Sequence, residues 1–204
     1  MNWSIGIAYL SQPGAGYISK IMIRIRDAQA DDLDEVVELW EQLAKHHERL
    51  SDKFSLALDG KRKWSKYLRE RFAEIRTKLI VAEEEGKIVG FMLCLLEPNV
   101  PVYKERKIGV ISDVYVMQQR RRKGVAKNML DYAIAWFVKN KVKTIRLNVA
   151  ADNLVARAAW RTLGFESFMI DKRLNLQSYR EREHQMRHFR VVQTRTKRRR
   201  SLLR

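Results

Sequence analysis

The chain has 204 residues, which is enough for one domain of ordinary size with a hydrophobic core. Apolar residues make up 46% of it, which excludes an intrinsically disordered protein, and its formal net charge is +17. No run approaches the roughly 18 apolar residues of a transmembrane helix, and the single cysteine, Cys94, excludes an internal disulfide. Cys94 lies in an apolar run, so we expect a buried thiol and a cytoplasmic protein.

The first elements are predicted from Met22 onward. We interpret residues 1–21 as an N-terminal extension of unclear role. This segment lacks the basic first region and the long apolar region of a signal peptide. Met22–Asp27 alternates apolar and basic residues, the pattern of a half-buried strand. Apolar residues from Leu33 to Ala44 recur at helical spacing after the cap Ala30–Asp32. A second amphipathic helix is predicted from about Gly60 to Arg76, and its apolar side consists of Trp64, Tyr67, Leu68, Phe72 and Ile75.

Three strands are predicted in the middle of the chain. Lys78–Glu83 and Lys87–Leu96 are apolar runs, and the turn Glu85–Lys87 between them is typical of an antiparallel hairpin. The loop Glu97–Pro101 ends this pattern, and Ile108–Val116 is the third strand.

The last third of the chain alternates helices and strands. We predict helices over Arg122–Val138 and Asp152–Leu163, with Gly164 ending the second one, and strands over Thr144–Val149 and Phe165–Ile170. An antiparallel first half followed by a β-α-β second half predicts an α/β (α+β) fold. Its sheet should be mixed, mostly antiparallel and flanked by helices.

The C-terminal end is strongly basic. From residue 177 to residue 204 there are ten Lys or Arg residues against Glu181 and Glu183, and the charge concentrates in Arg195–Arg200. We therefore divide the chain into the extension 1–21, a domain 22–176 and a basic tail 177–204. Such a tail attracts polyanions without reading their sequence, so a weak contact with nucleic acid is one reading and a solvated tail is the other.

A basic loop joins the predicted strand Ile108–Val116 to the helix that follows. Arg120–Lys123 is a run of four cations, which is unfavourable at a helix start unless an anion binds there. Free backbone N–H groups at a helix start bind anions, and Gly124 lets the backbone approach phosphate oxygens closely. These properties suit a diphosphate.

Two motifs resemble those of the GNAT superfamily of N-acetyltransferases. Arg121-x-x-Gly124-x-Ala126 resembles the acetyl-CoA signature [R/Q]-x-x-G-x-[G/A], and it follows a strand and opens a helix. The block from Asn153 to Phe165, with Ala156, Trp160 and Gly164, resembles N-x-x-A-x-x-x-Y-x-x-x-G-F. The resemblance covers about Met22 to Ile170. It implies the GNAT fold, with splayed central strands, and acetyl-CoA as acyl donor.

The resemblance also implies a set of site residues. The strand before the loop would pair with the pantetheine arm, the loop would bind the pyrophosphate, and Asn153 would hydrogen-bond near the pantetheine. The implied cofactor-binding residues are therefore Val114, Tyr115, Val116, Arg121, Arg122, Lys123, Gly124, Val125, Ala126, Asn153 and Trp160. Trp160 replaces the family's usual tyrosine, and an indole N–H cannot act as an acid near neutral pH. No metal site is expected.

The resemblance implies direct attack of a neutral amine on the acetyl thioester, so a base must take a proton from the ammonium form. At the position of Ser112 many relatives carry Glu, so this chain departs from the family there. The candidate catalytic residues lie near the splayed strand: Asp113 is on it, and Glu97 ends the preceding strand beside Pro98. Each also has a structural interpretation, as a hydrogen-bonding or solvated carboxylate. The sequence does not identify the acceptor amine, which is a small molecule or a protein or peptide amine. The strand segment Ile111–Val116 most resembles that of small-amine and polyamine acetyltransferases.

Other readings stay open. Two alternative hypotheses are a nucleic-acid- or ribosome-associated protein that uses its basic tail, and a catalytically weakened CoA-binding module. The resemblance also implies a homodimer, because relatives are often dimers. His46 and His47 are interpreted as a solvated helix end, and Trp40, Trp64 and Trp136 as core. His184 and His188 have the i, i+4 spacing of metal ligands but no third ligand in view.

Overall fold

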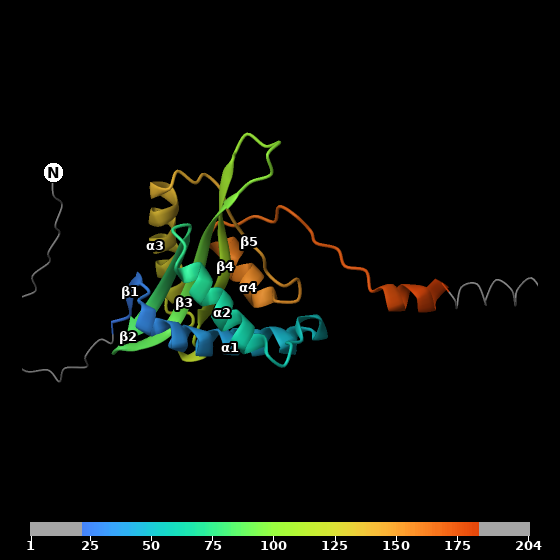
Figure 1. Ribbon diagram of the computed structural model, residues 1–204, viewed down its shortest axis with the longest axis horizontal. Helices are drawn as coiled ribbons and strands as arrows, with labels where there is room; N and C mark the ends of the chain where they lie inside the picture. Colours follow the sequence, from blue (N-terminus) through green and yellow to red (C-terminus); the bar gives the residue numbers. More distant parts are fainter. Residues whose placement is uncertain (1–21, 184–204) are drawn as a thin grey trace, which may run out of the picture. The chain divides into compact units, whose positions relative to one another are not determined.

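A computed structural model of the chain describes residues 22–183, and the elements run along it from blue to orange in Figure 1. The predicted N-terminal extension, the histidines at 184 and 188 and most of the basic tail lie outside the described residues. Within the described part, the chain forms one compact unit up to Leu163 and a second unit from Gly164 onward.

The first unit is built on a five-stranded sheet with the order β1-β2-β3-β4-β5. Every neighbouring pair is antiparallel except β4 and β5, which run parallel. The strands are β1 (Arg24–Asp27), β2 (Thr77–Glu84), β3 (Lys87–Pro98), β4 (Lys107–Val116) and β5 (Ile145–Leu147). The mixed, mostly antiparallel sheet predicted from the element order is confirmed.

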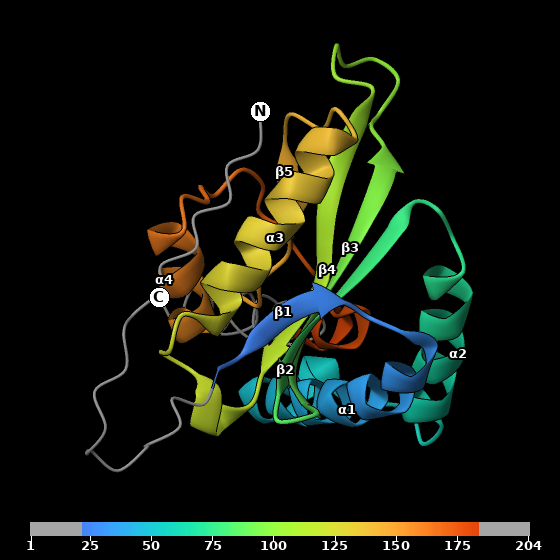
Figure 2. The ribbon, with the colours of Figure 1, turned by 90° about the vertical axis from the view of Figure 1, so that its left-hand side faces the viewer.

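Helices cover both faces of this sheet. Figure 2 shows α3 on one side of the strands, with α1 and α2 on the other. The bounds are α1 (Leu33–Leu50), α2 (Gly60–Phe72), α3 (Val125–Lys139) and α4 (Leu154–Thr162). Short 3₁₀ turns precede α1, α2 and α3, at Ala30–Asp32, Asp52–Phe54 and Gln118–Arg120.

The core lies mainly between the sheet and the first two helices. The apolar stripe of α1 and the fully buried Leu68 of α2 pack onto Phe91 and Leu93 of β3. Trp64 stacks on Trp40, with ring centroids 4.6 Å apart and planes within 10°, and its ring also meets Phe91 at 6.1 Å. Cys94, fully buried on β3, confirms the expected buried thiol, and burial raises its pKa to about 12.

The hairpin between β2 and β3 turns within the predicted segment Glu85–Lys87, at its first two residues, because Lys87 already pairs with Glu84. Glu85 and Gly86 both adopt left-handed backbone conformations, with φ of 50° and 76°. Two successive left-handed residues match the twist of an antiparallel pair, which explains why glycine stands at position 86.

Two predictions about elements are wrong. The second helix ends at Phe72 and not near Arg76, so Ile75 lies in a turn with 95% of its surface exposed. The segment Phe165–Ile170 forms no strand. Its apolar residues alternate only loosely, and Phe168, Met169 and Ile170 are all exposed. A strand needs hydrogen bonds to a neighbour, and alternation in a sequence does not supply that neighbour.

Candidate active site

The centre of β4 contains a β-bulge at Ser112. Leu93 of β3 pairs with Asp113, whereas the next residue, Cys94, pairs with Ile111, so Ser112 is the extra residue. Cross-strand partners point to the same face of a sheet, and Leu93 and Cys94 point to opposite faces. The bulge therefore turns Asp113 toward α1 and α2, while Ile111 faces α3.

The strands β4 and β5 part immediately before the bulge. Their parallel pairing covers only Gly109, Val110 and Ile111, and β4 then runs on to Val116 paired with β3 alone. The N–H of Met117 donates to the carbonyl of Val89 on β3 (2.9 Å), so the backbone groups of Val116, and of Val114 two residues earlier, face the opposite edge. This edge is where β4 is open to a further extended chain.

The loop after β4 has the backbone of an anion-binding turn. Arg122 and Gly124 both have left-handed conformations, with φ of 60° and 79°, and α3 begins at Val125 without a side-chain cap. The N–H groups of the first helical turn have no acceptor within the helix. A Cβ added at Gly124 would meet nothing within 4 Å, so this surface is open. A loop that opens a helix is confirmed, three residues later than the predicted start at Arg122.

The four cations of this loop have different surroundings. Arg120 donates through Nε to Glu84 of β2 (2.5 Å), which holds the 3₁₀ turn to the sheet. Arg121 folds back, so that its Nε donates to the carbonyl of Val116 (2.9 Å) and its guanidinium lies over the Tyr115 ring at 5.3 Å. Within residues 22–183, Arg122 and Lys123 are exposed and form no salt bridge, so their charge is available to a bound anion.

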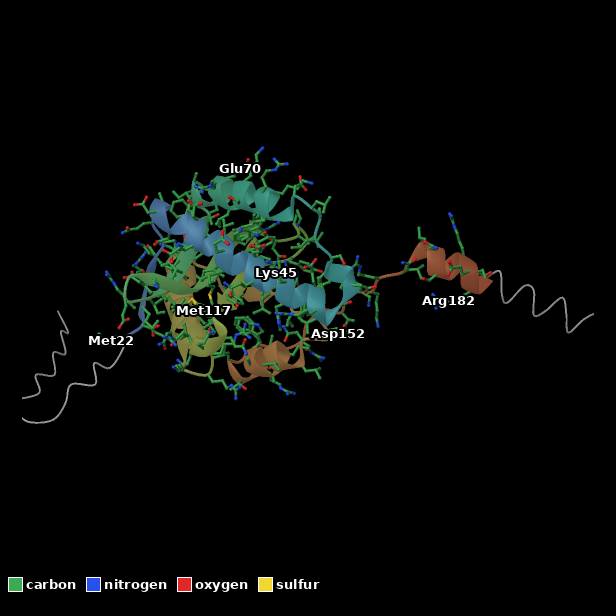
Figure 3. The ribbon with its side chains drawn as sticks, turned by 90° about the horizontal axis from the view of Figure 1, so that it is seen from below. Met22, Lys45, Glu70, Met117, Asp152 and Arg182 are labelled. Atoms are coloured by element: carbon green, nitrogen blue, oxygen red, sulfur yellow. The ribbon has the colours of Figure 1, made fainter. Side chains whose placement is uncertain are left out.

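Asp113 lines a small cavity between β4 and the two helices on its face. Ser112 donates through Oγ to Asp113 Oδ2 (2.7 Å), and Trp40 donates a second hydrogen bond to this carboxylate. The cavity has a volume of about 270 Å³, and its lining residues are Trp40, Leu43, Ala44, His47, Phe54, Leu56, Trp64 and Asp113. Figure 3 shows α1, which carries Lys45, beside α2, which carries Glu70, with Met117 marking the end of β4.

Asp113 and His47 are the titratable groups of this cavity. Burial raises the pKa of the Asp113 carboxyl, although the hydrogen bonds from Ser112 and Trp40 and the nearby His47 lower it. Burial lowers the pKa of His47, against the opposing effect of the Asp113 charge. His47 is therefore neutral at pH 7 and able to accept a proton. Next to it, burial and the charge of Arg121 lower the pKa of His46.

The structure does not bring the second candidate base into this cavity. Glu97 pairs with Ile108 and is exposed, four residues along β3 from the partner of Asp113. At about 3.3 Å per residue the two positions are roughly 13 Å apart along the sheet.

The two predicted site residues near α4 have positions on that helix. Asn153 caps it, because its Oδ1 accepts the N–H of Ala156 (3.0 Å), and this leaves the amide nitrogen as a donor. Trp160 is half-buried on the same helix.

The sequence predicts other roles for three residues of the cavity. It indicates a solvated helix end at His47, yet this residue is half-buried and contacts Phe54 at 5.4 Å between ring centroids. Trp40 and Trp64 do pack on the core, as expected, but they also form a wall of the cavity. Each tryptophan lies on the apolar stripe of its own helix. The spacing of a stripe predicts which residues are buried, but it cannot predict which of them border a cavity.

The comparisons with known proteins agree with this geometry. Residues 37–165 match the acetyltransferase (GNAT) family, which is more than half of the chain. An uncharacterized N-acetyltransferase of Archaeoglobus fulgidus is 26% identical over 136 residues, covering 66% of this chain and 87% of the relative. An uncharacterized N-acetyltransferase of Bacillus subtilis, YhfO, is 25% identical over 144 residues, covering 71% of this chain and 90% of the relative.

Solved structures share the fold. A predicted acetyltransferase from Clostridium acetobutylicum, crystallised with acetyl-CoA, superposes with a TM-score of 0.65 and 19% identity, over 77% of this chain and 98% of that one. An aminoglycoside N-acetyltransferase, AAC(6')-Iy, in complex with CoA superposes with a TM-score of 0.63 and 16% sequence identity, over 78% of this chain and 97% of that one.

The chain belongs to the acetyltransferase (GNAT) family. It is an acyltransferase with acetyl-CoA as acyl donor, as the two motifs predicted. Among residues 22–183, no helix has the length and apolar character needed to cross a bilayer, and no three His, Cys, Asp or Glu side chains are grouped to hold a metal ion.

Proposed function

We propose that the chain acetylates a primary amine by direct attack, with Asp113 receiving the proton that the amine must lose. The observation that carries this proposal is the bulge at Ser112, because it places a half-buried carboxylate on the α1 face while β4 opens toward β5 at the same point. Acceptor and donor can then approach one short stretch of backbone from different sides.

The residues around the opening fit acetyl-CoA. Val114 and Val116 present backbone groups to the open edge of β4, which suits the amide groups of a pantetheine arm. Because Arg121 already occupies the Val116 carbonyl, Val116 contributes its N–H. The Tyr115 side chain supports this edge from below, where its hydroxyl donates to Gln42 Oε1 (3.0 Å) and its ring meets Arg121.

The pyrophosphate fits the loop from Arg121 to Ala126. Left-handed residues at Arg122 and Gly124 turn successive N–H groups toward one side, as in other anion-binding nests. The N–H groups of Val125 and Ala126 open α3, where the helix dipole also favours an anion. Arg122 and Lys123 add unpaired positive charge at the rim.

Proton balance defines what the chain must supply. The amine nitrogen bonds to the acetyl carbonyl carbon while the bond from that carbon to sulfur breaks. An ammonium substrate releases two protons in becoming an amide: one neutralises the CoA thiolate, and we assign the other to Asp113 and, through it, to solvent. Trp160 cannot supply the proton of the thiolate, so the thiolate takes it from water after leaving; above the thiol pKa of about 8.5 it stays unprotonated and both protons of the ammonium end in solvent.

Two carboxylate variants test the assignment. Asp113→Asn should lower kcat/KM on any accepted amine by about 10²-fold, the scale of a lost general base, while Glu97→Gln should stay within about twofold of the wild type. Formation of the N-acetylated amine, followed by mass spectrometry, is the measurement. Full activity of Asp113→Asn would exclude Asp113, and a large loss in Glu97→Gln would assign the role to Glu97. A chain that forms no product with any amine would be a CoA-binding module.

A further inference from the structure

We propose that the acceptor is a small monoamine with a compact apolar body, bound in the cavity beside Asp113, and not a polycation such as a polyamine or an aminoglycoside. This inference rests on the proposed function and names its substrate class. It is carried by the composition, the rigidity and the size of the cavity.

The cavity contains a single carboxylate. Six of its eight lining residues are apolar, and the remaining two are His47 and Asp113. An ammonium group taken out of water needs a charged or hydrogen-bonding partner. Asp113 provides one such partner, so a second or third ammonium group would lie against apolar side chains. Glu48 accepts the N–H of the lining residue Leu56 (2.8 Å) and is not itself one of the lining residues.

Three of the six apolar lining residues are aromatic, and the two tryptophans among them hold each other in place. Trp40 and Trp64 are stacked at 4.6 Å, and Trp64 is braced in turn by Phe91. Phe54, the third aromatic lining residue, lies against His47, with ring centroids 5.4 Å apart. Aromatic faces attract a single cation and stack with a ring, but they offer no hydrogen bonds to the hydroxyl groups of a sugar. A substrate with one amine and a flat or aliphatic body would place its ammonium group at Asp113 and its body against the apolar side chains.

The size and the charge of the protein agree with this class. A volume of about 270 Å³ lies below the range of roughly 300–1,000 Å³ that is usual for drug-sized ligands. An aminoglycoside of several rings would extend far outside the cavity. The net charge of +17 also repels polycations more strongly than monocations.

A panel of amines tests the class directly. We would assay the full chain with acetyl-CoA and 2-phenylethylamine, ethylamine, spermidine, kanamycin or a peptide with N-terminal phenylalanine. CoA release can be followed with a thiol reagent, because Cys94 is buried and its pKa is raised to about 12. The expected kcat/KM for 2-phenylethylamine is at least tenfold above that for spermidine, kanamycin and the peptide. Ethylamine should fall more than about 10-fold below it, because it lacks the whole phenyl ring and even one missing methylene in an apolar pocket is worth about 10- to 200-fold.

A substitution at the cavity rim should reverse the preference. Leu56 lines the cavity and is 38% exposed, so Leu56→Glu adds a second carboxylate without opening the core. It should raise the ratio of kcat/KM for spermidine over 2-phenylethylamine at least tenfold. Leu58→Glu is the matched control, because Leu58 lies in the same loop, fully exposed and outside the cavity, and it should leave the ratio unchanged.

The failures of the two proposals are distinguishable. If acetyl-CoA binds and spermidine, kanamycin or the peptide is the best acceptor, the substrate class is wrong and the acetyltransferase proposal stands. The class is equally wrong if acetyl-CoA binds and no monoamine of the panel is acetylated, or if Leu56→Glu and Leu58→Glu shift the ratio alike. If no amine is acetylated and acetyl-CoA does not bind, the proposed function itself fails.

Discussion

Asp113 is held in surroundings that disfavour its charged form, and this has a consequence for stability. Its pKa is raised by burial, so the folded-state pKa lies above the unfolded-state value. Such a carboxylate destabilises the fold at pH above the folded pKa and has no effect below the unfolded pKa. A carboxylate that lowers the stability of the fold is accounted for if the reaction uses its charge.

Replacing this carboxylate should therefore stabilise the protein. We expect Asp113→Asn to raise Tm at pH 8, because the amide still accepts from Ser112 and Trp40 without carrying a buried charge. The gain should shrink as the pH falls to the unfolded-state pKa of about 3.9, and it vanishes well below that pH, where the wild-type carboxyl is protonated in both states. Thermal unfolding followed by circular dichroism at several pH values measures this. A lower Tm at pH 8 would show that Asp113 is a structural residue.

Asn153 has two roles that a pair of substitutions separates. Asp is as good a helix cap as Asn, so Asn153→Asp should keep the stability of the wild type while losing the amide donor assigned to the pantetheine. Asn153→Ala should lose both, with a cost of about 1 kcal/mol for the cap. Urea unfolding and acetyl-CoA titration read the two roles independently. Wild-type affinity in Asn153→Asp would limit Asn153 to capping α4.

At the scale of elements, β4 depends on the close approach of α3. A Cβ added at Gly109 would lie 2.6 Å from the ring of Phe137, which is 1% exposed and has no space to move. We expect Gly109→Ala to lower the free energy of unfolding by about 1–3 kcal/mol, the usual effect of overpacking, as measured by urea unfolding. Gly60→Ala is the control: its added Cβ makes only ordinary contacts, 3.5 Å or more from Leu56, at the start of α2. Equal losses in both variants would show that α3 does not pack closely on β4.

The helices and strands could be predicted from the sequence where one local pattern determines them. The β-bulge at Ser112 could not be predicted in this way. Leucine, valine and tryptophan spacing located α1, and Glu85-Gly86 located the hairpin turn. Counting along Ile108–Val116, however, places Ile111 and Asp113 on the same face. The extra residue at Ser112 reverses this, and it is a property of the register between two strands. For the same reason the sequence named Asp113 as a candidate base without showing that His47 and Trp64 share its cavity.

At the scale of the whole molecule, the described chain divides between Leu163 and Gly164. The family match ends at residue 165, close to this division, whereas the sequence placed the end of the domain at residue 176. The interval 165–176 includes the predicted strand that did not form. Whether a segment pairs depends on an available sheet edge, which is a property of the assembled fold and not of the segment. The boundary at 176 stays a prediction, as do the roles of the two ends of the chain.

The central claim is that the loop from Arg121 to Ala126 binds acetyl-CoA, and isothermal titration of the wild type against Gly124→Ala tests it most directly. Both Gly124 and Gly86 have left-handed backbones and open space around the missing Cβ. Alanine at either site should therefore cost about 1 kcal/mol of stability. We predict that Gly124→Ala weakens acetyl-CoA binding at least tenfold, while Gly86→Ala binds like the wild type. Unchanged affinity in Gly124→Ala, or no binding by the wild type at high micromolar acetyl-CoA, would contradict the account.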